Sequence, residues 1–515
     1  MPSSPLCLAV DLGTGGPKVG LATLRGEVLD HEVNAVETQR GADGSATQDA
    51  AEWWRLILAS SKALLERNPG SHARVRAVAV TGQFASTVPV DASGAPTGPC
   101  LTWLDTRGGR HVRDRIGGPF VGYSPTKVAT FIRRSAGAPS PGGADPVGHM
   151  LFMLEEQPEL VERTAYFMEP VDYLTMRFTG IASATHASRC AAWLADVRDL
   201  GRLDFDPKLL NLVGIPRGLL PPVVPFGSVV GHLSPAVAGE LGLAPDVAVV
   251  TGMPDLHAAA LASGTRIGDL HLALSSTSWI SCPTSKKKTD INHSIATAPG
   301  LGDGSYLVID NQETGAKALE WLQGVLAGGG PRRSFDELTA LAATSAPGAN
   351  GVVFTPWLNG ERSPVENRYL RASFSNLSMT TTTADLVRAV LEGVAANSRW
   401  LLRYVERFAD AGESEELRLL GGGASSDLWC QVVADATGRT VEQLPGPLTA
   451  QLGGATLLAA VALGEMTLAD VGASRPQGRR FEPSSDAAAA QERAELLPGI
   501  YRRDRRWRRS IKGVL

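Results

Sequence analysis

The segment DLGTGGPK, residues 11–18, joins two short apolar runs near the start of the chain, Leu6 to Leu12 and Val19 to Leu24. Both runs are rich in β-formers, so the pattern predicts a strand, a tight glycine turn and a second strand. The glycines let main-chain N–H groups approach an anion, while Thr14 adds a hydroxyl donor and Lys18 a positive charge. The turn therefore suits a phosphate group, although a glycine hairpin turn taken alone is more often only a turn.

Two common nucleotide-binding motifs do not describe this segment. Neither the GxxxxGK[ST] spacing nor GxGxxG fits, and a second strand follows where both motifs require a helix. A nucleotide-dependent oxidoreductase is therefore a poor interpretation. Further along, residues 50–65 have helical apolar spacing and residues 75–80 have the pattern of a strand. Such alternation of helices and strands predicts an α/β lobe.

The second half of the chain repeats this organisation. Val247 to Thr251 is a predicted strand, Leu256 to Ser263 is helix-like, and the apolar run His271 to Cys282 is interrupted by SSTS at 275–278. This second strand pair around a turn of small polar residues fits two similar lobes that each contribute a turn to a shared cleft. Ala384 to Phe408 is a predicted long amphipathic helix.

The composition argues against several kinds of partner. The 515 residues include 49 Lys and Arg against 53 Asp and Glu, a formal net charge of −4, with 43% hydrophobic residues. This balance supplies no positive field for nucleic acid or an anionic membrane, so we expect neither as a partner. The C-terminal arginines are better explained as a solvated helix face than as a partner-binding patch. They are Arg502, Arg503, Arg505, Arg506, Arg508 and Arg509.

The cysteines and the apolar segments favour a cytoplasmic protein. The five cysteines are scattered without a CxxC pair, which argues for a reducing compartment and against a disulfide framework or a zinc site. The first residues have no basic region before their apolar run and so do not have the pattern of a secretory signal. The apolar stretch Leu448 to Gly464 is shorter than the roughly 20 residues that a bilayer requires, so we expect a buried helix there.

A second glycine turn lies at residues 421–423, between a predicted strand and a predicted helix. Ser426 and Asp427 occupy cap-like positions at the start of that helix. A strand-to-helix turn of this kind can hold a flat ring or a phosphate against the backbone. A tight turn that is merely capped by Ser426 explains the pattern equally well.

One carboxylate also stands out, at the end of the segment Thr251-Gly252-Met253-Pro254-Asp255. It follows a predicted strand and precedes an alanine-rich helix. Asp255 could act as a general base at the floor of a cleft, or it could cap the helix, which is the commoner role of an isolated aspartate. The other motifs of the chain decide between these roles.

Several motifs occur together in a characteristic order. They are DLGTGGPK at 11–18, WLDTR at 103–107, GMPD at 252–255, SSTSW at 275–279, NGERSP at 359–364 and GGGASSDLWCQVVADATGR at 421–439. In this order and rough spacing the sequence resembles the FGGY carbohydrate kinases, most closely their xylulokinase-like branch. The resemblance runs from about Ala9 to about Gly464, and the last motif is highly specific.

The resemblance implies an α/β fold of two actin-like, ribonuclease H-type lobes that flank a deep catalytic cleft for a sugar and MgATP. The expected domains are residues 1–250, with the sugar and phosphate side, and residues 251–515, with the nucleotide side and the basic tail. The implied reaction transfers the γ-phosphoryl group of ATP to a sugar hydroxyl. Such a transfer mainly requires alignment of donor and acceptor, stabilisation of spread negative charge and exclusion of water.

The resemblance also implies roles for individual residues. Asp255 matches the general base, and Asp11 matches the residue that helps to hold Mg²⁺. The implied phosphate-binding residues are Gly13, Thr14, Gly15, Lys18, Ser276 and Thr277. The residues that would border the adenosine are Gly315, Gly422, Gly423, Ser426 and Asp427. The sugar side would be formed by Gln83, Phe84, Ala85, Asp105, Arg107, Asp255 and Leu256. Asp105 and Arg107 could instead pair with each other as structure, and Phe84 could be core.

The sugar-facing residues depart from the xylulokinase pattern. Those enzymes usually carry Ser-Gly-Gln-Met-His-Gly where this chain has Thr81 to Ser86, which puts Ala85 at the histidine position. The residue after the base is commonly Asn or Gln and is Leu256 here. A site that hydrogen-bonds hydroxyls selects its substrate by those bonds, so these changes alter the specificity. We therefore expect a small-sugar kinase, first for a pentulose such as D-xylulose and alternatively for another ketose or a polyol.

A catalytically silent actin-fold protein that binds nucleotide is the alternative from another class. The combined presence of Asp11, Lys18, Thr277 and Asp255 argues against it, because a silent protein needs neither the base nor the metal carboxylate. The sequence leaves open whether the protein is a homodimer, which hydroxyl is phosphorylated and which pathway it serves.

Overall fold

The computed structural model describes residues 4–120, 122–302, 304–409 and 415–510. The chain divides into two compact units. Unit 1 consists of Met1–Thr265, Thr297–Leu307 and Gln451–Pro476, and unit 2 of Arg266–Ala296, Val308–Ala450 and Gln477–Leu515. These units do not coincide with the expected domains 1–250 and 251–515. The chain returns to unit 1 twice, at Thr297–Leu307 and at Gln451–Pro476.

Unit 1 is built on a mixed sheet with the strand order β11-β12-β6-β1-β2-β3, and β13 also pairs with β6. The strands are β1 (Leu6–Gly13), β2 (Gly16–Thr23), β3 (Val28–Val33), β6 (Val75–Gly82), β11 (Val229–His232), β12 (Ala248–Val250) and β13 (Met253–Pro254). β1 and β2 pair antiparallel along their whole length, so the predicted hairpin is confirmed. β1 is buried almost throughout, which explains its nearly continuous apolar sequence.

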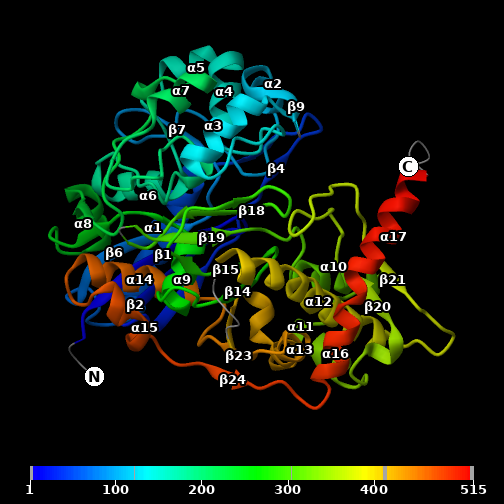
Figure 1. Cartoon of the computed structure of the whole chain (residues 1–515). Coiled ribbons are helices and arrows are strands. Elements are labelled where there is room, and N and C mark those ends of the chain that lie inside the picture. The colour runs from blue at the N-terminus through cyan, green and yellow to red at the C-terminus, as the bar shows by residue number, and fades with distance from the viewer. Residues whose placement is uncertain (1–3, 121, 303, 410–414, 511–515) are drawn as a thin grey trace. The chain divides into compact units, whose positions relative to one another are not determined.

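Helices cover this sheet and include the returning segment. They are α1 (Ala50–Arg67), α6 (Pro170–Thr179), α8 (Pro235–Leu241), α9 (Asp255–Ser263), α14 (Ala450–Ala462) and α15 (Leu468–Ser474). α14, drawn in orange in Figure 1, lies against β2 and α9, where a Cβ on Gly454 would come within 1.9 Å of Ala258 O. The apolar stretch at 448–464 is therefore a buried helix, as predicted, and packs on the N-terminal sheet.

A further layer of unit 1 is mostly helical and has its own apolar core. Its helices are α2 (Gly109–Ile116), α3 (Pro125–Ser135), α4 (Pro146–Glu156), α5 (Pro158–Glu162) and α7 (Pro207–Val213). Its short strands are β4 (Gln39–Arg40), β5 (Ala46–Gln48), β7 (Val88–Val90), β8 (Cys100–Leu101), β9 (Gly117–Phe120) and β10 (Tyr166–Met168). Proline stands at the start of several of these helices, where its missing N–H costs nothing.

Unit 2 is built on a sheet with the order β15-β14-β22-β23-β24. Its strands are β14 (His271–Leu274), β15 (Ser278–Ser281), β16 (Pro283–Thr284), β17 (Thr289–Asp290), β18 (Ile295–Pro299), β19 (Tyr306–Ile309), β20 (Val353–Thr355), β21 (Ser373–Ser375), β22 (Glu416–Leu420), β23 (Thr440–Gln443) and β24 (Arg479–Phe481), of which β18 and β19 run into unit 1. The hairpin β14–β15 confirms the second predicted strand pair.

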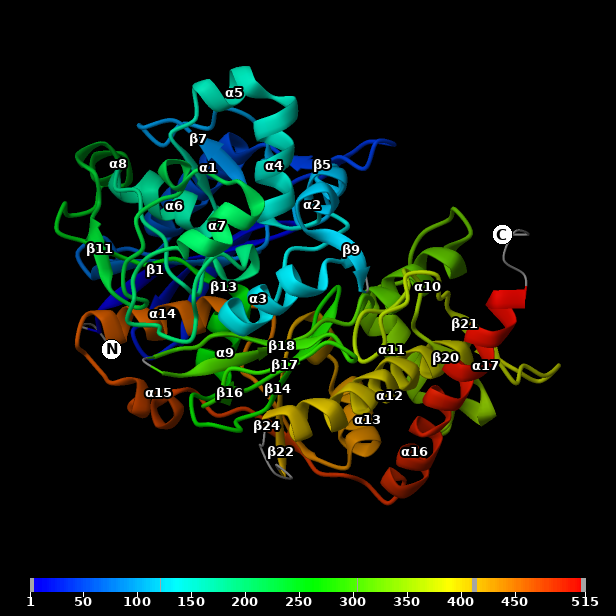
Figure 2. The same ribbon diagram turned by 45° about the horizontal axis from the view of Figure 1, so that its top comes forward.

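Helices pack around this second sheet. They are α10 (Lys317–Ala327), α11 (Phe335–Ala343), α12 (Thr383–Ala409), α13 (Asp427–Thr437), α16 (Ala487–Ala494) and α17 (Leu496–Ser510). Figure 2 shows α12 and α13 side by side, with α16 along them. α12 is the predicted long amphipathic helix and buries Val387, Val390 and Val394.

The remaining sequence expectations concern the cysteines, the membrane and the tail. All five cysteines are buried free thiols. In the described ranges, no helix is both long and apolar enough to span a bilayer. The arginine-rich tail belongs to α17, where Arg502, Arg503 and Arg505 are all exposed. The side chains of Arg506, Arg508 and Arg509 lie outside the described residues.

Candidate active site

The turn between β1 and β2 is shaped by close backbone packing. Gly16 has a φ of +129°, and a Cβ there would lie 2.1 Å from Asn34 O, so only glycine fits. The amide of Val36 donates to Gly15 O at 2.9 Å and fastens the tip of the turn, whereas Gly15 itself is exposed. The turn is therefore a fixed backbone loop whose tip faces solvent.

Asp11 and Lys18 form an ion pair across this hairpin. They are directly opposed residues of β1 and β2, and Lys18 Nζ donates to Asp11 Oδ2 at 2.7 Å. Asp11 is almost fully buried, whereas the Lys18 side chain is 24% exposed. The charge of Asp11 raises the pKa of Lys18 above its usual value, against the opposing effect of burial. Lys18 therefore stays positively charged at neutral pH.

Asp255 is brought to the same place by the sheet. Met253 and Pro254 of β13 pair with Thr81 and Gly82 of β6, and Asp11 of β1 pairs with Thr81 from the other side. Since these strands are parallel, their carboxyl ends meet at one edge, which is where ligands bind in open α/β sheets. Sequence reasoning had placed Asp11 and Asp255 in one site only through the resemblance.

The environment of Asp255 suits a group that exchanges a proton near neutral pH. Burial raises its pKa to about 7, and the charge of Asp11 adds to this increase. The amide of Leu256, which donates to Asp255 Oδ1 at 2.8 Å, and the charge of Lys18 lower it. The carboxylate lies at the first position of α9 and is half-buried. Its hydrogen bond from the Leu256 amide is of the kind found at helix ends. Its charge interacts with Asp11 and Lys18, which a residue that only caps the helix would not need.

The same two carboxylates fit a magnesium ion. Mg²⁺ commonly uses one or two carboxylates together with substrate phosphates and waters, rather than an all-protein cage. Asp11 and Asp255 interact electrostatically, and only one Asp11 oxygen is taken by Lys18. No cluster of three or more His, Cys, Asp and Glu suited to a metal occurs among the described residues. The donor set therefore fits a metal that arrives with a phosphate ligand.

Side-chain hydrogen bonds connect the β1–β2 turn to its neighbours. Trp103 Nε1 donates to Thr14 Oγ1 at 3.0 Å, and Gln48 Nε2 donates to Thr14 O at 2.8 Å. Thr14 Oγ1 lies 3.5 Å from Gln83 Oε1, and Gln83 Nε2 donates to Gln48 Oε1 at 3.2 Å. Gln48 was missed by the sequence analysis, because it belongs to no motif and lies in a short strand far from the turn.

The residues expected on the sugar side differ in their exposure. Phe84 and Ala85 are half-buried, so Phe84 is not a pure core residue, whereas Gln83 and Leu256 are each only 4% exposed. Ala85 has a φ of +60°, a conformation that costs a non-glycine residue free energy. The turn that carries Ala85 is therefore held in place by its surroundings.

Asp105 and Arg107 pair with each other, which is the structural alternative that the sequence left open. Arg107 donates to Asp105 from Nε and Nη2, with Nη2 2.7 Å from Oδ2. Asp105 is fully buried, and its Oδ2 also accepts from the amide of Ala46 at 3.0 Å. The Arg107 guanidinium lies 4.4 Å from the centre of the Phe152 ring. The carboxylate of Asp105 is thus already satisfied within unit 1.

In unit 2, the second predicted phosphate turn connects β14 to β15. Ser276 is exposed and Thr277 half-buried at its tip. The amide of Gly315 donates to Ser276 O at 2.9 Å, and a Cβ on Gly315 would lie 2.4 Å from Thr277 O. Gly315 therefore allows its segment to lie directly against the turn, so these predicted residues are brought together.

The glycine turn after β22 lies beside this region of unit 2. A Cβ on Gly421 would lie 2.6 Å from Ser275 Oγ. Ser426 caps α13 by accepting from the amide of Trp429 at 3.2 Å, as predicted. Gly422 is exposed and Gly423 buried, and the exposed Asp427 carboxylate is paired with Arg479. The predicted nucleotide-binding residues of unit 2 therefore form one contiguous group.

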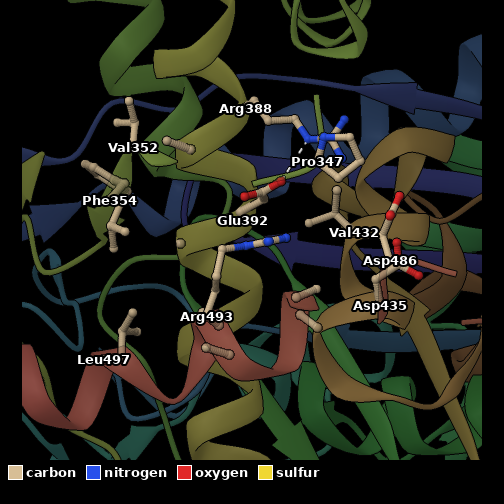
Figure 3. A pocket seen from close by; sticks show the side chains of 17 residues that line it. Pro347, Val352, Phe354, Arg388, Glu392, Val432, Asp435, Asp486, Arg493 and Leu497 are labelled. Atoms are coloured by element: carbon tan, nitrogen blue, oxygen red, sulfur yellow. Dashed lines mark hydrogen bonds and ion pairs between the residues drawn. The ribbon is translucent and has the colours of Figure 1, made fainter. Parts of the chain in front are cut away.

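A separate cavity of about 40 Å³ lies among α12, α13 and α16 of unit 2. Figure 3 shows Arg388, Glu392 and Arg493 among its lining residues, together with apolar side chains such as Phe354. Glu392 Oε1 is already bonded to Arg388 Nε and to the amide of Gly348. The volume accommodates about three waters, so this cavity is not a site for a nucleotide or a sugar.

The fold is that of the actin-like ATPases, as expected from the sequence. Residues 6–262 match the N-terminal domain of the FGGY family of carbohydrate kinases, and residues 276–463 match its C-terminal domain. The chain belongs to the FGGY family of carbohydrate kinases. It is an ATP-dependent sugar kinase, a phosphotransferase with an alcohol group as acceptor.

Individual relatives carry different substrate names. A xylulose kinase of Staphylococcus epidermidis is 28% identical over 477 residues, covering 89% of this chain and 88% of that protein. A gluconokinase of Bacillus subtilis is 24% identical and covers 95% and 94%. The crystal structure of gluconate kinase from Lactobacillus acidophilus has a TM-score of 0.83 at 18% identity and covers 99% of both chains, which supports the fold alone.

Proposed function

We propose that this kinase transfers the γ-phosphoryl group of ATP to a hydroxyl of a small ketose, first a pentulose such as D-xylulose, with Asp255 as the general base. The observation that carries this proposal is the cluster of Asp11, Lys18 and Asp255 at one edge of the unit 1 sheet. It combines a base, a cation and a second carboxylate at the end of a glycine turn.

Asp255 accepts the proton of the sugar hydroxyl as the new P–O bond forms. A carboxylate can do this without an extreme pKa, because the acceptor oxygen becomes acidic only late in phosphoryl transfer. A pKa of about 7 keeps a substantial fraction of Asp255 ionised at neutral pH. The Leu256 amide holds one carboxylate oxygen, which fixes the direction in which the other one points.

Each unit has its own proposed phosphate-binding groups. Those of unit 1 are the backbone amides of Gly13 and Gly15, the Thr14 hydroxyl and the Lys18 ammonium, and those of unit 2 are the hydroxyls of Ser276 and Thr277. Gly315, Gly422, Gly423, Ser426 and Asp427 border the adenosine in this proposal. Phosphoryl transfer is accelerated chiefly by alignment and by donors directed at spread negative charge. The contiguous packing of the unit 2 residues supports this grouping.

Mg²⁺ would be held by Asp11, with Asp255 nearby. When bound with ATP, the ion neutralises phosphate charge and orients the transferred group. The Lys18 ammonium can then pair either with Asp11 or with a phosphate oxygen. Its exposed fraction and its flexible stem allow the ammonium to move between the two.

The acceptor is expected to be a sugar that needs few polar contacts near Ala85 and Leu256. Asp105 supports this expectation, because its carboxylate is used by Arg107 and the Ala46 amide. Relatives named xylulose kinase and gluconokinase make D-xylulose and gluconate the reference substrates. A pocket that lacks hydroxyl-binding groups discriminates less sharply between such substrates than one that has them.

An ADP-release assay over a substrate panel tests the proposal. The panel contains D-xylulose, L-xylulose, D-ribulose, D-fructose, glycerol, xylitol and gluconate, each with MgATP and with the Asp255→Asn variant as the blank. We expect the highest kcat/KM with a pentulose, at a modest margin over the other acceptors. ADP release that no panel member stimulates would favour the silent nucleotide-binding alternative, and a gluconate optimum would reject the ketose assignment.

A further inference from the structure

A buried carboxylate lies directly behind the turn that carries Ala85. Glu169 follows β10 and occupies the N-cap position of α6, where its side chain is fully buried. Its Oε2 accepts a hydrogen bond from the amide of Ser86 at 3.2 Å. Its Oε1 is buried and has no hydrogen-bond partner among the described residues. No motif of the sequence includes Glu169, and the proposed mechanism does not use it.

Glu169 acts on the turn and not on a substrate. Oε1 is shielded from solvent, so a sugar cannot reach it while the turn is in place. The backbone of the turn is fixed from two directions, since the Gln83 amide donates to Leu12 O at 2.7 Å while the Ser86 amide donates to Glu169. Between these two bonds lies Ala85, with its φ of +60°. Such a conformation persists only where the surroundings hold it.

The turn is linked by hydrogen bonds, through Trp103, to the proposed phosphate-binding turn that contains Thr14. Ser86 Oγ accepts from the amide of Trp103 at 3.0 Å, and Trp103 Nε1 donates to Thr14 Oγ1 at 3.0 Å. A continuous series of hydrogen bonds thus runs from Glu169 through Ser86 and Trp103 to Thr14. Every one of these residues belongs to unit 1.

Charged and titratable groups surround Glu169 from several elements. Arg189, which is 3% exposed, bonds to Phe167 O through Nη1, while its Nε and Nη2 are buried without partners in the described chain. Asp172 of α6 is bonded to the Ser188 hydroxyl at 2.9 Å. Burial raises the pKa of Glu169 to about 8 and the charge of Asp172 adds to this increase, whereas Arg189 and the backbone amides of Ser86 and Ala85 lower it. Cys100 and Cys190 also interact electrostatically with Glu169.

We propose that Glu169 is a positioning residue, which holds the Gln83–Ser86 turn and, through Trp103, the Thr14 hydroxyl in their working arrangement. This inference rests on the proposed function, in which that turn lines the sugar side and Thr14 binds phosphate. One buried carboxylate then positions both the turn on the sugar side of unit 1 and the Thr14 hydroxyl on its phosphate side.

The kinetic test replaces Glu169 by a residue of similar volume that has no oxygen to accept the hydrogen bond from the Ser86 amide. Glu169→Met is close in shape but cannot accept from the Ser86 amide, whereas Glu169→Gln retains an acceptor oxygen. We expect Glu169→Met to lower kcat/KM for the sugar about tenfold to a hundredfold, mostly through KM, since small misplacements of binding groups have effects of this size. The KM for ATP should change less than the KM for sugar, and Glu169→Gln should recover most of the loss.

Asp172→Asn is the matched control. Asp172 of α6 is nearly as deeply buried as Glu169 and its charge interacts with Glu169, but its hydrogen bond is to Ser188 and not to the turn. We expect its sugar KM to stay within about twofold of wild type. A purely structural role of Glu169 would instead lower the folded fraction and reduce the apparent activity with ATP and sugar alike.

Hydrogen–deuterium exchange tests the positioning itself, independently of turnover. Peptides that cover residues 83–104 should exchange faster in Glu169→Met than in wild type, Glu169→Gln or Asp172→Asn. If Glu169→Met does not fold, Ser86→Ala, which removes the acceptor for the Trp103 amide, should show faster exchange near Trp103 and a raised sugar KM. Unchanged exchange, or faster exchange with an unchanged sugar KM, overturns the proposal. If wild type phosphorylates no sugar, the proposed function fails while the exchange result still decides whether Glu169 holds the turn.

Discussion

The two turns that we propose to bind phosphate are held in different ways. In unit 1, the β1–β2 turn is fastened by side chains as well as by backbone. The ion pair of Asp11 and Lys18 and the bonds of Trp103 and Gln48 to Thr14 add to the bond from the Val36 amide to Gly15 O. In unit 2, the β14–β15 turn is fastened by backbone bonds, from the amides of Gly315 and Ala316 to the carbonyls of Ser276 and Ser275.

This difference separates two kinds of sensitivity. Buried charged side chains are costly to lose and are hard to replace by another residue type. Backbone bonds survive most side-chain changes but fail when a Cβ is forced between two strands of main chain. The turn of unit 1 should therefore respond to the identity of its side chains as well as to backbone packing, and the turn of unit 2 chiefly to backbone packing.

The largest effect is expected in unit 1, at the base. Asp255→Asn should lower kcat about 10²- to 10⁴-fold, the usual contribution of a general base, while ATP binding measured by calorimetry stays near wild type. In wild type, kcat/KM should rise with pH up to about 7, because the base must be ionised. Exposed Asp246→Asn is the control. A variant that turns over within a few-fold of wild type would remove Asp255 from the mechanism.

The next effect is also in unit 1 and concerns Lys18. Lys18→Ala should lower kcat about 10²-fold, as expected for the loss of one charged donor to the reacting group. Since ATP is common to all reactions, the factor should be the same for every accepted sugar. Lys62→Ala removes a lysine that is 44% exposed and paired with Glu240, and should have no effect. A loss confined to one sugar would show that Lys18 contacts the acceptor.

The comparison also shows which parts of the molecule the sequence could predict. Both hairpins, α1, α12 and the buried α14 follow from local apolar patterns and glycine positions, because such patterns depend on near neighbours. The meeting of Asp11 and Asp255 does not follow from any local pattern. It depends on the pairing of β1 and β13 with opposite sides of β6, and the sequence reached it only through the family resemblance.

Other features of unit 1 could not be predicted from the sequence. Residues 451–476 return to unit 1, where Gly454 lies very close to Ala258. The only sign of this contact in the sequence is a glycine within an apolar helix. The sequence does not decide whether Asp105 pairs with Arg107. The same carboxylate also accepts from the amide of Ala46, which lies in a distant segment and belongs to no motif. Glu169 precedes a proline and looks like an ordinary helix cap, although its carboxylate bonds to another segment.

A smaller effect is expected in unit 2, where the backbone holds the turn. Gly315→Ala would place a Cβ 2.4 Å from Thr277 O, so the turn must shift. We expect the KM for ATP to rise about tenfold with a smaller change in the KM for sugar, since displaced donors weaken binding to this degree. Gly324→Ala in α10 is the matched control, because its Cβ would meet only Arg332, at 3.7 Å. Equal effects of the two substitutions would mean that the turn does not bind nucleotide.

The last effect is on stability rather than on activity and concerns Asp255 again. Its pKa is about 7 in the folded protein against 3.8 for the ordinary group. Between these values the folded state binds more protons than the unfolded state, so the free energy of unfolding falls as pH rises from about 4 to 7 and is then level. Asn cannot ionise and avoids this loss. Asp255→Asn should therefore be more stable than wild type at pH 8 by about 1–3 kcal/mol, after allowance for its partial exposure. The difference, measured by urea unfolding, should vanish near pH 4, and Asp246→Asn should show none at either pH. A variant that is less stable than wild type at pH 8 would mean that the Lys18 and Leu256 contacts outweigh the cost of burying the charge.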